Sequence, residues 1–546
     1  MSAFSAPVAL PLVDMVLKNG RITTFADPDE GPSETTGLAI AQGRIVAVGA
    51  DKDMERYEAL AARVIDLEGR RVLPGLNDSH IHAMRAGVSW NRVVHWEDVT
   101  DLDDGLKKIQ TDAKRRGRGE WVGVVGGWHQ TQMRQGRAPT REELDEVAPH
   151  NPAVVQELYD RAVLNSAALA ACDFRDDSPD PPRGKLLRDE DGKLTGEIRG
   201  AGAFAIPLAK LLQFDDEQAR AGVREMGATF AQHGLTGVVD AGGLLVTPRD
   251  YDPLYAVWRA GELNLRTRLF ISAWTRGGEV QDIDQLTSLV QPESGDGMLR
   301  VAGVGEIPHL GCHDMEGLDN FHLSDSAHAE LIEIMRLCAV RGWRMSIHAV
   351  LDYTLNRILD AWEQIEAETG LVAHRGNSIV HADEASPETL ERIAKLGIGV
   401  LVQSRLVLKG SDYVESWGAE ATENAPPIAD MRALGIKIGG GTDSTRANWF
   451  SPWTAIWWLV TGQSLNGVGN RAQRHCLTVE QAIASYTKDA AWFTGESEHR
   501  GKLLPGYDAD LCVPTRDPFS CSPDELRNIR SVLTITDGRI THETLA

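Results

Sequence analysis

Apolar runs alternate with amphipathic stretches through the middle of this chain, and this alternation restricts its fold more than any other feature. The clearest runs are WVGVVGG, AVVQELY, GLTGVVDAGG, RTRLFISAW, LRVAGVGEI, RMSIHAV, NSIVHAD, IGVLVQS and KIGGGTDS. Between them lie helical stretches such as SPETLERIAKLG, which begins at Ser386 and ends at Gly397. Repeated strand and helix units of this kind form parallel sheets. The pattern predicts an α/β fold, a (β/α)8 TIM-type barrel with insertions.

Both ends of the chain contain short strands separated by glycine turns. Near the start these are DMVLKNGRITTF, GLAIAQGRIVAVG and ARVIDLEGRRVLPG, and near the end GYDADLCVPT and SVLTITDGRITH. Because a lone small sheet buries little apolar surface, we expect the two ends to form one small β-sandwich. The predicted domains are a sandwich made from residues 1–74 and 499–546, and a barrel over residues 75–498 with an insertion at roughly 105–215.

The charge balance and the spacing of the cysteines indicate which partners and which cellular compartment to expect. The 56 basic and 79 acidic residues give a formal net charge of −23, and no basic run could follow a phosphate backbone, so we expect no nucleic-acid partner. Six widely spaced cysteines indicate a reducing compartment rather than a disulfide framework. The N-terminal stretch MSAFSAPVALPLVDMVLKNG has no basic residue before its short apolar patch and no long hydrophobic core, so we expect no secretory signal. No later apolar run is long enough to span a membrane. We expect a cytoplasmic protein with no membrane partner.

Residue types that bind metals lie at the ends of four apolar runs. LNDSHIHA contains His80 and His82, RMSIHAV contains His348, NSIVHAD contains His381 and KIGGGTDS contains Asp443. The C-terminal ends of barrel strands converge on one mouth, and residues i and i+2 of a strand share a face. We therefore expect both imidazoles of the His-x-His pair to point towards the other three side chains.

Four imidazoles and a carboxylate are a suitable ligand set for zinc or a similar divalent ion. An open coordination position would let the ion lower the pKa of a bound water, and Asp443 could take the proton from it. A single histidine at a strand end is more often a core residue, but four strand ends that carry such side chains and open at one rim favour a metal site. The sequence predicts one or two divalent ions, most readily Zn2+, with Asp443 and His381 as catalytic residues.

The same residues carry a family resemblance. VLPGLNDSHIHA resembles the Pro-Gly-x-x-Asp-x-His-x-His opening of the amidohydrolase superfamily, and the other three residues follow in the order that the superfamily uses. LTVEQAIASYTKDAAWFTGESEHRGKLLPGYDADLCV is similar to its closing helix and return strand. GGWHQTQM and VLNSAALAA resemble the amidohydrolase-3 branch, which includes N-substituted formamide deformylase and YtcJ-like hydrolases. The resemblance implies a metal-dependent barrel with a sandwich built from both termini.

The fourth strand departs from the pattern of that superfamily. Many relatives use a carboxylated lysine there to bridge two metals, but MLRVAGVGEIPHLGCHD has no lysine, and Glu306 ends its apolar run. Glu306 could bridge the metals directly, support a ligand or bind substrate. If Glu306 is not a ligand, a single metal would be held by His80, His82, His348 and Asp443. His381 would then lie near the substrate carbonyl. His309, Cys312 and His313 are further candidate ligands.

A second departure concerns the predicted substrate residues of the insertion. In LYDRAVLNSAAL, Asp160 stands near the place where branch members usually carry a histidine, with Tyr159 and Arg161 beside it. Arg161 could clamp an anionic substituent of the substrate, or it could form a surface salt bridge. Trp128 and His129 of GGWHQ replace the usual Trp-Asp pair of the branch. Both departures indicate an altered specificity.

The stretch ANWFSPWTAIWWLVTG, directly after Asp443, is rich in tryptophan. Such a run could line a substrate pocket, or it could be a helix that packs on the barrel or at an oligomer interface. Trp449 and Phe450 lie nearest the barrel mouth and are the predicted pocket residues.

The residues and the resemblance together favour one function over two alternatives. The main hypothesis is a metal-dependent hydrolase that uses activated water to cleave a non-peptide C–N bond in an amide, N-formyl or N-acyl compound. The first alternative is a deaminase or cyclic amidase acting on a heterocycle. The second is a catalytically silent binding or regulatory protein on the same fold. The expected partner is a small-molecule substrate, and a homo-oligomer is compatible with the sequence.

Overall fold

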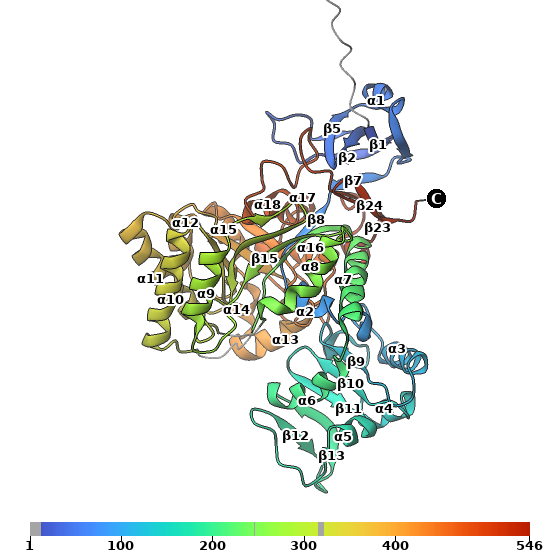
Figure 1. Cartoon of the computed structure of the whole chain (residues 1–546), viewed down its shortest axis with the longest axis vertical. Helices are drawn as coiled ribbons and strands as arrows, with labels where there is room; N and C mark the ends of the chain where they lie inside the picture. Colours follow the sequence, from blue (N-terminus) through green and yellow to red (C-terminus); the bar gives the residue numbers. More distant parts are fainter. Residues whose placement is uncertain (1–12, 245, 315–320, 546) are drawn as a thin grey trace, which may run out of the picture.

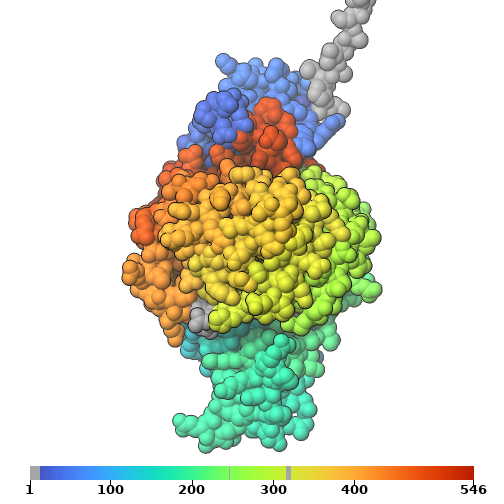
Figure 2. All heavy atoms as spheres, turned by 90° about the vertical axis from the view of Figure 1, so that its left-hand side faces the viewer, coloured from blue at the N-terminus to red at the C-terminus, as the bar shows by residue number. Residues whose placement is uncertain are grey.

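Three parts make up the computed structural model of the chain, which describes residues 13–244, 246–314 and 321–545. A barrel lies in the centre, a sandwich lobe lies at one end of it and the insertion at the other (Figure 1; Figure 2 shows the same order from the side). Residues 1–12, which make up most of the stretch on which the expectation about a secretory signal rests, lie outside the described residues. No helix within the described ranges has the length and apolar character that a membrane span requires.

Eight parallel strands form the barrel, which confirms the predicted fold class. Neighbouring strands pair in the order β8, β14, β15, β17, β18, β19, β20, β21. Backbone bonds then join the last strand region to the first, from Asp443 N to His80 O at 2.9 Å and from His82 N to Ser444 O at 2.6 Å. The strands are β8 (Leu76–Ile81), β14 (Leu235–Asp240), β15 (Arg266–Ile271), β17 (Leu299–Glu306), β18 (Arg344–Ala349), β19 (Ser378–His381), β20 (Gly399–Gln403) and β21 (Ile438–Gly441).

Helices cover the outside of the barrel because each presents one apolar face to the strands. Helix α12 (Pro387–Leu396) begins where the sequence predicts, with the Ser386 side chain accepting a bond from Thr389 N, and ends at Gly397. The other large covering helices are α7 (Asp216–Ala231), α8 (Asp252–Arg259), α9 (Glu279–Leu289), α10 (Asp325–Val340), α11 (Asp352–Thr369), α13 (Leu406–Trp417) and α16 (Pro452–Thr461). Shorter ones are α2 (Ala83–Gly87), α14 (Ala419–Glu423), α15 (Ile428–Ala433), α17 (Val479–Ser485) and α18 (Lys488–Phe493).

The insertion has a five-stranded sheet of its own, in the order β12-β13-β11-β10-β9. WVGVVGG and AVVQELY, expected as barrel strands, form β9 and β10 of this sheet instead. The two strands pair in parallel and are largely buried, so their apolar runs look like those of barrel strands. The elements are α3 (Leu102–Arg115), β9 (Val122–Val125), α4 (Arg141–Val147), β10 (Ala153–Glu157), β11 (Arg161–Leu164), α5 (Ser166–Ala171), β12 (Lys185–Arg188), β13 (Leu194–Arg199) and α6 (Ala201–Leu211).

Strands from the two ends of the chain share one sheet of the sandwich lobe, as the sequence predicts. A six-stranded sheet has the order β24-β23-β22-β7-β2-β3, and a four-stranded sheet has the order β5-β4-β1-β6. The strands are β1 (Val13–Lys18), β2 (Arg21–Thr23), β3 (Glu34–Thr35), β4 (Gly37–Ala41), β5 (Arg44–Gly49), β6 (Ala61–Asp66), β7 (Arg71–Pro74), β22 (Leu511–Pro514), β23 (Ser531–Thr536) and β24 (Arg539–Glu543). Their shared core includes Leu17 from the start of the chain and Ile535 from its end.

Buried ion pairs connect the first residues of β15 to the C-terminal part of the chain. Arg266 donates to Asp510 at 2.7 Å, and Arg268 donates to Glu496 at 2.7 and 3.0 Å. Arg500 donates to the same glutamate at 2.7 Å. Each of these cations thus has a carboxylate partner at the N-terminal end of the barrel.

Candidate metal centre

Six side chains for which the sequence predicts a metal site gather at the C-terminal ends of the barrel strands. Each comes from the last residues of a strand or from the loop after it, and none is more than 5% exposed. They are His80 and His82 of β8 and its end, Glu306 of β17, His348 of β18, His381 of β19 and Asp443 after β21. The fold therefore brings all six to one mouth, where barrel chemistry usually lies.

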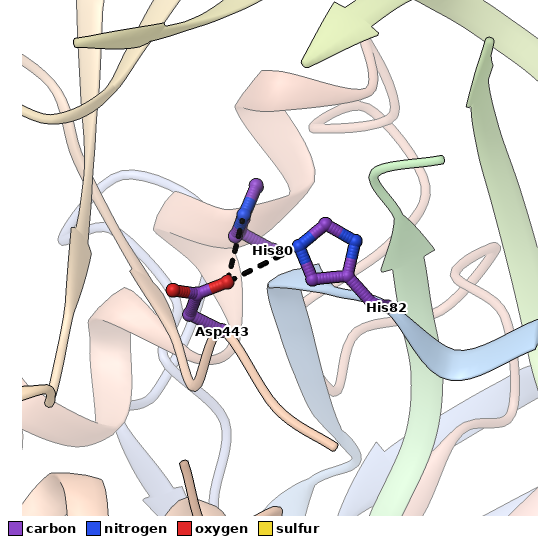
Figure 3. Close-up of side chains that lie close together, drawn as sticks. All are labelled: His80, His82 and Asp443. Carbon is purple, nitrogen blue, oxygen red and sulfur yellow. Dashed lines mark ion pairs between the residues drawn. The ribbon is translucent and has the colours of Figure 1, made fainter. Parts of the chain in front are cut away.

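The His-x-His pair shares one carboxylate oxygen of Asp443. Oδ1 of Asp443 lies 3.2 Å from Nε2 of His82 and 3.5 Å from Nε2 of His80. Figure 3 shows both rings turned towards this carboxylate. The cause is local: His80 and His82 lie on the same side of the strand end, and the backbone bonds that close the barrel hold Asp443 beside them.

Glu306 lies between two pairs of histidines. Its Oε1 is 3.2 Å from Nε2 of His82, and its Oε2 is 3.3 Å from Nε2 of His80 and 3.4 Å from Nδ1 of His348. The same nitrogen of His348 lies 3.1 Å from Nε2 of His381. A carboxylate with histidines on both sides has the position that a bridge between two ions requires.

Several atoms of this cluster are buried without a hydrogen-bond partner, which fits a metal site. Nε2 of His80 and Oε2 of Glu306 have none among the described residues. Nδ1 of His82 lies 2.9 Å from the carbonyl oxygen of Gly242, and this contact turns Nε2 of the ring towards the cluster. The nitrogen and oxygen atoms of His80, His82 and Asp443 lie within 4.8 Å of one another. Because buried polar atoms normally find partners, their convergence here favours a bound cation.

Asp314 orients His348 from outside the cluster, and the sequence did not single it out. Its Oδ1 lies 2.8 Å from Nε2 of His348, the ring nitrogen that points away from Glu306. Its Oδ2 accepts the N–H groups of Val350 at 2.9 Å and Leu351 at 2.8 Å. A carboxylate behind a histidine is a common support of metal ligands. The only available sequence signal was its place in the loop after Glu306.

Mutual attraction sets the charge states of the cluster. Burial alone would raise the pKa of Glu306 and Asp443, but the facing histidines hold both well below their usual values. The pKa of His82 is correspondingly held well above its usual value by Glu306 and Asp443, against the effect of burial. Burial and the neighbouring His348 hold the pKa of His381 well below its usual value. Ionised carboxylates and a neutral imidazole are the forms that coordinate cations.

The backbone is strained at two of the strand ends that carry the cluster. His381 has a φ of 79°, Ala382 of 56° and Asp443 of 56°, all in the left-handed region. Non-glycine residues rarely adopt this region, and such strain collects at functional sites. The strain is consistent with side chains that are aimed for a task other than packing.

The insertion covers one side of the mouth through its GGWHQ segment. The N–H of Gly127 donates to the carbonyl oxygen of Arg446 at 2.9 Å, on the loop that carries Asp443. The hydroxyl of Thr131 donates to the carbonyl oxygen of Leu408, after β20, at 3.0 Å. The insertion therefore supports two loops of the barrel mouth directly.

Trp128 and His129 lie at different depths of the insertion. The Trp128 indole donates to the carbonyl oxygen of Gln156 at 2.7 Å and packs on Trp96, inside the core of the insertion. His129 lies at the seam with the barrel, where its Nδ1 is 2.8 Å from the hydroxyl oxygen of Thr131. Of the two, His129 is the one placed near the mouth.

Tyr159 and Arg161 of the insertion have different partners. The hydroxyl of Tyr159 accepts a hydrogen bond from the guanidinium of Arg85, which belongs to α2 directly after the His-x-His pair. Arg161 is paired with the buried carboxylate of Glu157, with 2.6 Å between Nε and Oε2. Its guanidinium also donates to Gln130. The geometry matches the salt-bridge interpretation of Arg161.

The tryptophan-rich stretch faces a cavity of its own. The Trp449 indole donates to Gln132 at 3.1 Å, and Phe450 stacks on Phe230 with 5.3 Å between ring centroids. Both residues line a cavity of about 610 Å³ between the insertion, the barrel and the C-terminal segment, and no member of the metal cluster lines it. The rest of the stretch forms α16, whose tryptophans are buried.

The three further candidate ligands do not join the cluster. His309 lies 2.9 Å from a carboxylate oxygen of Glu330, and the thiol of Cys312 contacts the carbonyl oxygen of Ala327. His313 stands behind His348, with 5.8 Å between ring centroids. None of the three contacts the atoms that converge on Glu306 in the described part of the chain.

Comparisons with known proteins agree with this geometry. A family model described as "Amidohydrolase family" matches residues 63–542. N-substituted formamide deformylase of Arthrobacter pascens is 26% identical over 554 residues, which cover 97% of this chain and 98% of that protein. The putative amidohydrolase YtcJ of Bacillus subtilis (strain 168) is 24% identical over 539 residues, 94% and 97% of the two chains.

A solved structure shares the fold. An uncharacterized metal-dependent hydrolase from Pyrococcus horikoshii superposes with a TM-score of 0.66 at 22% identity, and covers 93% of this chain and 99% of its own. At this level of identity the likeness establishes the architecture of barrel, insertion and sandwich.

Proposed function

Because the chain belongs to the amidohydrolase family, we propose that it is a metal-dependent hydrolase of a non-peptide carbon–nitrogen bond in an amide, N-formyl or N-acyl compound. The observation that carries the proposal is the buried cluster of four imidazoles and two carboxylates. A barrel gains no stability from burying such groups together unless a cation or a substrate compensates them.

The donor set favours divalent zinc, and its two halves suit two ions. His80, His82 and Asp443 would hold one ion, and His348 and His381 would hold the other, with Glu306 between them. Bound there, a divalent ion polarises a carbonyl group and lowers the pKa of a water molecule. Glu306 would take the place of the carboxylated lysine that many relatives use.

Asp443 is the residue best placed to move protons. The facing histidines keep its pKa low, so it is ionised and able to accept a proton from the attacking water. The same carboxylic acid would then give that proton to the departing amine, which leaves more easily when neutral. Asp314 keeps the His348 ring in place during this exchange through their 2.8 Å contact.

Metal analysis tests the site. Wild-type protein should contain two equivalents of zinc or a similar ion, Glu306→Gln about one, and His80→Ala less than one. His150→Ala, which changes an exposed histidine, is the matched control and should retain the wild-type content. One equivalent in the wild type would support the single-ion arrangement with His381 beside the substrate carbonyl. No bound metal, or a content that His80→Ala leaves unchanged, would overturn the metal site.

A substrate panel tests the reaction. N-formyl amines, N-acyl amino acids and heterocycles should be incubated with metal-loaded enzyme, and formate, free amine and ammonia measured. Release of an amine from the first two classes is the expected result. Ammonia from heterocycles alone would indicate the deaminase alternative, and no product from any class would favour the binding-protein alternative.

A further inference from the structure

Gln403 is the last residue of β20, and both polar atoms of its buried side chain are without partners. The residue is 1% exposed. Neither Oε1 nor Nε2 has a hydrogen-bond partner among the described residues. Burying an amide in this way is costly, since each polar atom gives up its hydrogen bonds to water. Because buried polar groups of native proteins are normally paired, this side chain points to a task other than packing.

The pairing of the barrel strands places the Gln403 side chain inside the barrel. His348, a member of the metal cluster, pairs with Val380, and Val380 pairs with Leu401. Gln403 follows Leu401 by two residues. Paired residues of neighbouring strands share a face of the sheet, as do residues i and i+2 of one strand, so Gln403 faces inwards like His348. Val402, on the opposite face, packs in the core that the covering helices share.

Gln403 also lies at the level of the metal cluster along the barrel axis. It pairs with Gly441 of β21, and a side-chain atom on Gly441 would lie 2.8 Å from Cβ and 3.0 Å from the backbone nitrogen of His80. β20 lies between β19, whose last residue is His381, and β21, which Asp443 follows by two residues. The unpaired amide therefore stands in the mouth between two strands that carry cluster residues.

The chemistry of Gln403 differs from that of the cluster beside it. The six cluster residues are imidazoles and carboxylates, which the proposed function assigns to the metal ions. A glutamine amide is neutral and offers one acceptor oxygen and two donor hydrogens. A neutral group of this kind, unpaired within the protein, suits the neutral part of a substrate rather than an ion.

A secondary amide presents two polar groups at the bond that is cut, its carbonyl oxygen and its N–H. In the proposed function the carbonyl oxygen faces a metal ion. The N–H then requires an acceptor of its own, because a donor buried without one weakens binding. The carboxylates of Glu306 and Asp443 already face histidines. Oε1 of Gln403 is a neutral acceptor at the same level of the mouth.

We propose that Gln403 binds the scissile amide of the substrate, with its Oε1 accepting the N–H of the nitrogen that leaves. This inference rests on the proposed function and narrows the substrates to amides that carry an N–H, which excludes N,N-disubstituted amides. Because Asp443 follows the neighbouring strand, the same contact would hold the leaving nitrogen beside the proposed proton donor.

Two pairs of substrates test the inference on the whole chain loaded with metal. N-phenethylformamide and N-phenethylacetamide carry the N–H, and their N-methyl derivatives lack it. We expect the wild type to prefer the N–H member of a hydrolysed pair by about 100-fold or more in kcat/KM. Gln403→Met, which keeps the length of the side chain without its amide, should reduce this preference by about 10- to 100-fold. Gln403→Glu keeps an oxygen acceptor and should retain part of it.

Equilibrium binding gives a readout that does not require turnover. Calorimetry on the Asp443→Asn variant, after its metal content has been measured, compares N-phenethylformamide with its N-methyl derivative. The N–H compound should bind about 10-fold more tightly or better, and adding Gln403→Met should remove the difference. Gln285→Met, which changes an exposed glutamine, is the matched control. The thermal midpoint of Gln403→Met should be equal to or above that of the wild type, since the change removes a buried amide without a partner.

The outcomes separate this inference from the proposed function. Hydrolysis without a preference for the N–H compounds, or with a preference that Gln403→Met leaves intact, overturns the inference and leaves the hydrolase standing. A lower thermal midpoint of Gln403→Met with unchanged hydrolysis overturns it too, because the amide then serves the packing of the barrel. A preference that Gln403→Glu loses as completely as Gln403→Met overturns the role of Oε1 as acceptor.

The proposed function fails in a different way. No hydrolysis of any N-formyl or N-acyl compound overturns it, and the calorimetric comparison then still decides whether Gln403 binds an amide N–H.

Discussion

The two ends of the barrel treat buried charge in opposite ways. At the N-terminal end Arg266, Arg268 and Arg500 each donate to a carboxylate at 2.7 Å. At the C-terminal end His80 and His82 face Glu306 and Asp443 at 3.2–3.5 Å, and some atoms of this cluster have no hydrogen-bond partner among the described residues.

The difference indicates that the buried charges at the N-terminal end of the barrel serve stability, whereas those at the C-terminal end serve function. A charge that has an aligned partner inside the protein is satisfied, and its removal threatens folding. A charge whose partner is a bound cation or substrate is balanced only when that ligand is present, so its removal should leave the fold intact. Variants at the two ends should therefore lose different properties.

The largest effect is expected from the C-terminal end. Asp443→Asn should lower kcat by about 10³- to 10⁴-fold, because an amide cannot accept the proton from water. Steady-state hydrolysis of the best panel substrate measures this loss, and thermal unfolding should show a midpoint close to that of the wild type. Asp177→Asn, at an exposed position, is the control. A loss of activity that merely follows a loss of folded protein would contradict the comparison.

At the N-terminal end the loss should appear in stability. Glu496→Gln leaves Arg268 and Arg500 without their buried counter-charge and should lower the free energy of unfolding by about 3–5 kcal/mol. Urea unfolding measures it, with the exposed Glu498→Gln as the control. The specific activity of the protein that remains folded should stay near the wild-type value. If activity falls while stability is kept, the two ends do not divide their roles in this way.

Lowering the pH should reduce the contribution that Glu496 makes to the stability of the fold at the N-terminal end of the barrel. The pKa of Glu496 is held far below its usual 4.5 by Arg500, His499 and Arg268, against the effect of burial. A group of this kind stabilises the fold above its unfolded-state pKa and loses that contribution as pH falls below it. The stability gap between wild type and Glu496→Gln should therefore shrink below pH 4.5, by up to about 1.4 kcal/mol per pH unit. A gap that stays constant between neutral pH and acid would refute this assignment.

The smallest effect concerns the seam between the insertion and the barrel mouth. Arg161→Gln removes the partner of the buried Glu157 and should lower stability by roughly 1 kcal/mol, since Arg161 is itself partly exposed. Its preference between carboxylated and neutral substrates should match that of the wild type. Hydrolysis of carboxylated and neutral substrates by Arg161→Gln and by the wild type, measured side by side, decides whether Arg161 binds an anionic group of the substrate.

Much of the fold could be predicted because its signals are local. Apolar runs identified the barrel strands, and the i, i+2 spacing of His80 and His82 placed two rings on one side of a strand. The positions of His348, His381 and Asp443 at strand ends brought them to the same mouth, because parallel strands share a direction. These inferences need only the period of the strand and the topology of the barrel.

The remainder depended on contacts between distant segments, which a sequence does not display. β9 and β10 have the same apolar runs as barrel strands, but they pair with each other in the insertion. The sequence left two roles open for Arg161, and its ion pair with Glu157 became evident only in the structure. The support that Asp314 gives to His348 likewise became evident only from their contact.

The shared sheet of the sandwich also constrains how the molecule is made. β7 pairs with β22, and the contact between Pro74 and Cys512 joins residues 438 positions apart. At about 5–20 residues per second, a ribosome needs roughly 20–90 s to cover that interval. During this time β7 presents an unpaired edge, the kind of surface on which nascent chains associate with one another. Synthesis of the final segments, rather than emergence of the barrel, is the event that protects this edge.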